Sequence, residues 1–108
     1  MYDDTGGYPT LAQIRAWIQV PATVLDDEQL GWVAAGEQAN QSRLEWGGGD
    51  LPDDAHQAFL RRVARSTAAK GIPLGIMAAD AEWGTVRLSR WDSEIERLEA
   101  PYVVPVFA

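Results

Sequence analysis

Residues 51–71, LPDDAHQAFLRRVARSTAAKG, carry the clearest helix signals in the sequence. Pro52 suits the first position of a helix, and the carboxylates of Asp53 and Asp54 suit the positive end of the helix dipole. Gly71 suits the left-handed conformation that ends many helices. Apolar or small side chains recur on one face at helical spacing: Ala55, Phe59, Leu60, Val63, Ala64 and Thr67. The stretch is therefore predicted to be the central helix of the fold.

Two capping patterns upstream predict two more helices. In each, a hydroxyl or carboxyl side chain is followed three positions later by glutamine, which is the arrangement of a capping box. The first begins at Thr10 and predicts a helix over residues 11–19. The second begins at Asp26 and predicts a helix over residues 27–45.

A fourth helix is predicted near the end of the sequence. Ser89 begins another capping pattern, and Trp91, Ile95 and Leu98 follow at spacings of four and three. We expect this helix to cover residues 90–99, because Pro101 cannot continue it.

The segments between these helices differ in character. Residues 1–9 are polar and contain two glycines, so we expect a flexible lead, and the three glycines within residues 46–50 predict a hinge. Residues 72–89 form a long loop in which residues 85–88 alternate like a short strand. Residues 101–108 are an apolar, extended C-terminal tail. The sequence thus predicts a single all-α domain, a small four-helix bundle with a long loop between the third and fourth helices.

The negative charge of the chain argues against nucleic acid as a non-specific binding partner. Of 108 residues, 16 are acidic and 9 basic, giving a net charge of −7. Residues 1–54 carry ten carboxylates against two arginines, whereas residues 55–108 are nearly neutral. Non-specific nucleic-acid binding is therefore not expected, because its affinity comes from cations that neutralise phosphates. No apolar run reaches the roughly 20 residues that span a bilayer, so we expect a soluble protein with no membrane contact.

No group of residues predicts an enzyme or a cofactor site. The sequence has no cysteine, which excludes disulfides, thiol catalysis and cysteine-ligated metals. The one histidine, His56, lacks metal-ligating or catalytic neighbours at a recognisable spacing. Three carboxylates, Asp92, Glu96 and Glu99, share one face of the last helix, where we expect them to be solvated.

The central helix has a basic face formed by Arg61, Arg62, Arg65 and Lys70. One interpretation is a recognition helix that contacts a phosphate backbone. The other is a set of salt bridges to the second helix or to an acidic neighbouring subunit. The acidic surface elsewhere would repel DNA, which favours the salt bridges.

Aromatic and apolar residues predict a protein interface. Of the five tryptophans, Trp17 and Trp91 lie on core-facing stripes, while Trp46 and Trp83 adjoin glycines in loops. Aromatic residues are enriched at the centres of protein–protein interfaces. The tail adds apolar side chains that a small core has little room for, so the tail is predicted to dock on a partner.

Three stretches resemble the head-to-tail adaptor (head–tail connector) proteins of long-tailed double-stranded-DNA bacteriophages. They are YPTLAQIRAWIQVPATVLDDEQL at residues 8–30, LPDDAHQAFLRRVARSTAAKGIPLG at residues 51–75 and RLSRWDSEIERLEAPY at residues 87–102. Together they cover most of the chain in the same order and at similar spacing. The hinge at residues 46–50 and the apolar end PVFA lie outside the resemblance.

The resemblance implies a structural virion protein at the phage neck, without enzyme activity or cofactor, that is assembled in the host cytoplasm. Copies of the chain, commonly twelve, would form a ring below the portal, prolong the DNA channel without binding DNA sequence-specifically, and offer a platform to the stopper or tail-completion protein. The resemblance implies that the last helix and the tail grip the portal, while other loops meet the stopper. The candidate residues for docking on the portal or a neighbour are Trp91, Ile95, Leu98, Tyr102, Val103, Val104, Val106 and Phe107. The long loop is expected to face the channel or a neighbouring subunit through Asp80, Glu82, Trp83 and Arg87. Arg61, Arg62 and Arg65 are candidates for a basic inter-subunit face.

Two other function classes remain open at this point. A small DNA-binding regulator would use Arg61, Arg62 and Arg65, and its binding would weaken with salt. A generic cytoplasmic interaction adaptor would use the same tail but would never form rings.

Overall fold

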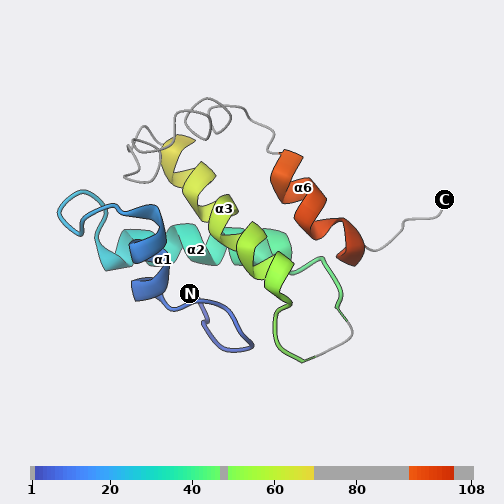
Figure 1. Ribbon diagram of the computed structural model, residues 1–108. Coiled ribbons are helices and arrows are strands. Elements are labelled where there is room, and N and C mark those ends of the chain that lie inside the picture. The colour runs from blue at the N-terminus through green and yellow to red at the C-terminus, as the bar shows by residue number, and fades with distance from the viewer. Residues whose placement is uncertain (1, 47–48, 70–92, 104–108) are drawn as a thin grey trace.

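The computed structural model describes residues 2–46, 49–69 and 93–103. These residues form α1 (Leu11–Ile18), α2 (Asp27–Gln41), α3 (Asp53–Ala69), α6 (Ser93–Glu99) and a short 3₁₀ turn, η1 (Ala100–Tyr102) (Figure 1). They contain no strand, so the prediction of an all-α bundle is confirmed for this part of the chain. The predicted long loop, its strand, the first turn of the last helix and residues 104–108 of the tail lie outside the described residues.

Helix α3 is the centre of the bundle, as the sequence predicts. It packs against each of the other three helices, and α1 also touches α2 (Figure 1). The main core is built around the fully buried Phe59 and Val63 of α3, together with Ile14 and Ile18 of α1 and Leu30 of α2. The four-residue spacing of Phe59, Val63 and their neighbours therefore marks the face that meets the other helices.

The first two helices begin as their capping patterns predict. The side chain of Thr10 accepts from the backbone N–H of Gln13, whose own side chain accepts from the backbone N–H of Thr10. Asp26 and Gln29 make the same reciprocal pair at the start of α2. Each capping box satisfies two backbone donors that a helix start would otherwise leave unpaired.

Helix α2 ends four residues before its predicted end at residue 45. Beyond Gln41 the chain turns, with the N–H of Leu44 donating to the carbonyl of Gln41 at 3.0 Å. The N–H of Glu45 then donates to the carbonyl of Tyr102 in η1, at 3.0 Å. Because these residues bury Leu44 and bond to η1, they leave the helical path that local propensity favours.

The segment expected as a flexible lead is packed on the bundle. The ring of Tyr2 stacks on Phe59 with centroids 5.7 Å apart, and Tyr8 meets the same ring edge-on at 5.1 Å. Gly6 accepts a hydrogen bond of 2.8 Å from the N–H of Leu51. Tyr2 and Tyr8 of this segment are thus packed on a core phenylalanine, a contact that the prediction of a flexible lead did not include.

Candidate functional site

The last helix is held to α3 by apolar side chains that the sequence analysis assigned to docking. Ile95 and Leu98 are only 4% and 6% exposed and form a small core with Ala58. They therefore contribute to the stability of this chain and offer no docking surface, which corrects that assignment. Trp91, Val104, Val106 and Phe107, from the same predicted set, lie outside the described residues.

A buried ion pair fixes the end of α6 on the middle of α3. The guanidinium of Arg62 donates to both carboxylate oxygens of Glu99, from Nε and Nη2, each at 2.6 Å. The exposed fractions of the two residues are 7% and 3%. The hydrogen bonds that Arg62 donates to Glu99 raise the pKa of Arg62 above its usual value, although burial opposes this. Arg62 therefore stays charged, and a two-hydrogen-bond pair of this kind is strongly directional.

This ion pair corrects two expectations. Glu99 does not belong to a solvated face of the last helix, because it is enclosed against α3. Arg62 does not belong to a basic face open to DNA or a neighbouring subunit, because Glu99 occupies its guanidinium. The salt-bridge interpretation is confirmed for Arg62, which also lies 3.6 Å from Glu37 of α2, measured from Nη1 to Oε1.

Gln41 extends the ion pair to α2 and the N-terminal segment. Its Nε2 donates to Glu99 at 3.0 Å and to the carbonyl of Ala55 at 2.9 Å. Its Oε1 accepts from the hydroxyl of Tyr8 at 3.2 Å. Burial raises the pKa of Tyr8, so the hydroxyl keeps its proton for this bond. Gln41 is itself fully buried, and the cluster of Arg62, Glu99, Gln41 and Tyr8 thus joins three helices and the lead.

Sequence reasoning identified none of this cluster as buried. The one signal was the register of α2, where Gln41 and Glu37 fall on the same face as the apolar Leu30, Val33 and Ala34. A polar side chain on a core-facing position is expected to have a hydrogen-bonding partner.

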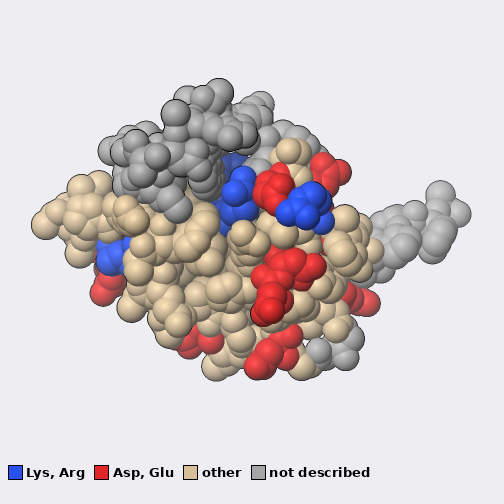
Figure 2. Space-filling model, in the orientation of Figure 1, with Lys and Arg blue, Asp and Glu red and all other residues tan. Residues whose placement is uncertain are grey.

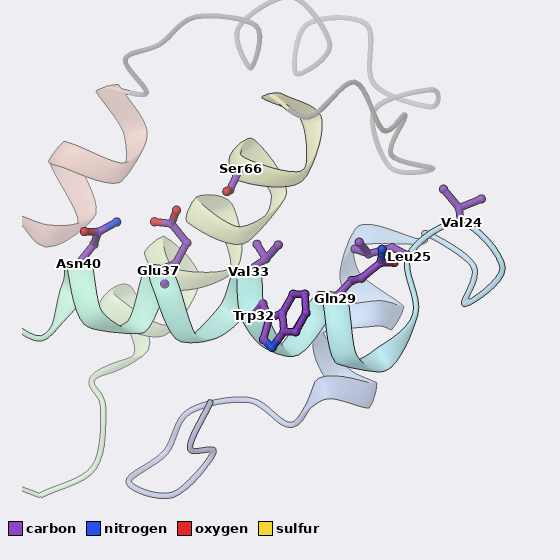
Figure 3. Close-up of a pocket in the computed structure, with 9 residues that line it drawn as sticks. Val24, Leu25, Gln29, Trp32, Val33, Glu37, Asn40 and Ser66 are labelled. Atoms are coloured by element: carbon purple, nitrogen blue, oxygen red, sulfur yellow. The ribbon is translucent and has the colours of Figure 1, made fainter. Parts of the chain in front are cut away.

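A groove runs along the outer side of α2 and reaches α3 (Figure 3). Its volume is about 670 Å³. One part is apolar and is lined by Val24, Leu25, Trp32 and Val33, of which Val24 and Trp32 are 52% and 60% exposed. The other part is polar, lined by Glu37 and Asn40 of α2 and Ser66 of α3, with Gln29 and Gly36 completing the wall. We refer to this as the α2 groove.

Glu37 connects the α2 groove to the buried cluster. Its Oε1 lies inside the protein without a hydrogen bond from the described residues, although Arg62 is 3.6 Å away. A buried carboxylate oxygen of this kind is a ready acceptor for an N–H group.

The 3₁₀ turn η1 carries the chain away from the bundle at the other end of α2. The Tyr102 hydroxyl donates to Asp54 at 2.5 Å, and this bond raises the pKa of Tyr102. Its ring meets the half-buried Trp46 edge-on, with centroids 6.5 Å apart. The next residue, Val103, is 54% exposed. The prediction of an extended tail is therefore wrong for Pro101 and Tyr102, which belong to η1, and the half-buried Tyr102 bonds within the chain. Val103, the first tail residue beyond this turn, is an exposed apolar side chain.

The remaining predicted positions are a histidine, two arginines and four residues of the long loop. His56 is half-buried in the first turn of α3, and no group of three potential metal ligands occurs among the described residues. Arg61 and Arg65 are half-buried. Hydrogen bonding by Arg97, with a contribution from the charge of Arg61, lowers the pKa of Glu94. The predicted loop residues Asp80, Glu82, Trp83 and Arg87 lie outside the described ranges.

On the face shown in Figure 2, acidic side chains lie along the lower part and also beside the basic ones in the upper part. In the described part of the chain, no helix has both the length and the apolar character needed to cross a membrane.

Comparison with known proteins gave no match, either to a protein-family model, to a curated protein or to a solved structure.

Proposed function

We propose that this chain is a structural connector of a long-tailed double-stranded-DNA bacteriophage. In this role it forms a ring below the portal, prolongs the DNA channel and offers a platform to the stopper or tail-completion protein. Its site of action is the neck of the virion, after assembly in the host cytoplasm. The proposal starts from the sequence resemblance, which spans most of the chain.

One structural observation supports it above others. A small helical domain exposes large apolar side chains in two separate places, Val24 and Trp32 at the α2 groove and Val103 after η1. A ring subunit must contact a neighbour on each of two sides, so it needs two different surfaces.

The charge of the chain supports the same function. At a net charge of −7 per copy, a ring presents a strongly negative body to DNA. Like charges repel the phosphate backbone, which lets a packaged duplex slide through a channel instead of adhering to its wall.

The ion pair between Arg62 and Glu99 argues against the alternative of a DNA-binding regulator. Its recognition face requires Arg62, whose guanidinium is buried and engaged by Glu99. Releasing Arg62 for a phosphate would leave the Glu99 carboxylate buried and unpaired, which is costly.

The alternative of a generic interaction adaptor uses the same apolar surfaces. It differs from the connector in two measurable properties, because an adaptor of that kind does not form rings and does not bind a portal.

The test is light scattering on a sizing column, for the chain alone and mixed with the portal protein of the same phage. We expect a complex of the portal with a ring of this chain, visible as such by electron microscopy. Antibody labelling of whole virions should place the chain at the neck. A chain that ignores the portal and is missing from virions would overturn the proposal.

A further inference from the structure

Three large apolar side chains are exposed among the described residues, and they divide into two groups. Val24 and Trp32 belong to the apolar part of the α2 groove, near the start of α2. Val103 lies at the other end of that helix, because the backbone of Glu45 bonds to Tyr102 beside it. Val24 and Trp32 therefore line a concave surface, whereas Val103 is followed by the apolar sequence VPVFA at residues 104–108.

The tail and the groove have matching chemistry. Residues 103–107 read VVPVF and carry no charged side chain, as suits the wall formed by Val24, Leu25, Trp32 and Val33. An extended segment also presents backbone N–H and carbonyl groups. The polar part of the groove offers the side chains of Asn40 and Ser66 as partners for these groups (Figure 3).

The length of the tail limits which groove its last residues can fill. An extended chain covers at most about 3.5 Å per residue, so Phe107 reaches about 14 Å beyond Val103. The rise of α2 from Trp32 to Gln41 alone takes about 14 Å, at roughly 1.5 Å per residue. Val103 follows Tyr102, whose carbonyl accepts from the N–H of Glu45, four residues past the end of α2. The groove that Phe107 can fill is that of another molecule.

We propose that residues 103–107 of one copy pack into the α2 groove of the next copy. The contact joins two different surfaces of the same chain, so repeating it builds a closed ring or a filament. This inference rests on the proposed ring function and specifies how the ring is held together. It places the tail on a neighbouring copy, whereas the resemblance by itself also allows the portal as its partner.

Two full-length variants each disrupt one side of this contact, the groove or the tail. Gly36→Gln blocks the groove, and it does not threaten the fold, since an added Cβ meets no atom within 4 Å and glutamine favours a helix more than glycine. Phe107→Ser weakens the tail. Ala39→Gln is the matched control, because it adds the same side chain to an exposed position of α2 outside the groove.

Sedimentation velocity, run on each protein at the highest soluble concentration, measures the association. We expect wild type and Ala39→Gln to form multimers, and Gly36→Gln and Phe107→Ser each to remain monomeric. An equimolar mixture of the two monomeric variants should form a complex of twice the monomer mass and stop there. The intact tail of one variant fits the open groove of the other, and no second contact is left to extend the pair.

Several results would overturn the inference without deciding the function. Multimers of Phe107→Ser that match wild type would show that the tail is not the occupant. A mixture that stays monomeric, or a wild type that never associates, would also reject the contact. Portal binding by the same variants is scored separately. Loss of portal binding with intact multimers assigns the tail to the portal, and absence of portal binding by wild type rejects the connector function itself.

Discussion

Replacing Glu99 with leucine should remove a large share of the stability of the domain. Arg62 is only 7% exposed. In the described part of the chain, the substitution leaves Glu37, at 3.6 Å, as the one carboxylate beside its guanidinium. Removing one member of a buried ion pair typically costs about 3–5 kcal/mol. Small domains are stable by about 5–15 kcal/mol, so Glu99→Leu should shift the urea unfolding midpoint strongly, as followed by circular dichroism.

Two companion variants show whether the loss comes from the unpaired charge. The double variant Arg62→Met with Glu99→Leu should recover most of the stability, because apolar replacements of a whole buried pair are often neutral. Glu94→Leu makes the same substitution on the same helix, where the partner Arg97 has a 68% exposed side chain, and should barely move the midpoint. A Glu99→Leu loss no larger than that of Glu94→Leu would refute the reasoning.

Two further predictions concern the packed N-terminal segment. Gly7→Ala should cost about 1–3 kcal/mol, because Gly7 has a φ of +90° and an added Cβ would lie 2.9 Å from the backbone nitrogen of Leu51; Gly6→Ala, with no atom within 4 Å, should cost less in the same urea titration. Burial raises the pKa of Tyr2 and Tyr8 above the usual value of 10.0, so the folded state holds these protons more tightly than the unfolded state. The stability from both groups is complete below pH 10 and is lost as pH rises through the raised values, so unfolding midpoints should fall above pH 10 and less so in Tyr8→Phe.

The helices could be predicted because their signals are local. The capping boxes at Thr10 and Asp26 and the spacing of Phe59 and Val63 each lie within one or two turns. Hydrogen bonds of this range are set by neighbouring residues and do not require knowledge of the tertiary structure. Even the central position of α3 followed from local patterning, since it has the longest apolar face.

The buried cluster could not be predicted in the same way. Arg62 and Glu99 are 37 positions apart, and each has polar neighbours that favour a solvated face. Whether such side chains meet depends on how α6 lies on α3, which is a property of the whole bundle. The packed lead escaped prediction for the same reason, because Tyr2 contacts Phe59 across more than half of the chain.

The ion pair of Arg62 and Glu99 contributes more to the orientation of α6 on α3 than to the stability of the domain. Apolar side chains in place of Arg62 and Glu99 would stabilise the bundle about as well, so strength alone does not account for the pair. A guanidinium bound through Nε and Nη2 fixes direction as well as distance, and Glu99 is the last residue of α6 before η1. The pair therefore sets the angle at which Val103 leaves the domain. Glu37 lies beside the same guanidinium and lines the α2 groove. Glu37, Arg62 and Glu99 therefore connect the groove, which would receive a tail, to η1, from which the tail leaves the domain. The ring that we propose needs a constant angle between those two surfaces in every copy, and the ionic link between them would supply it.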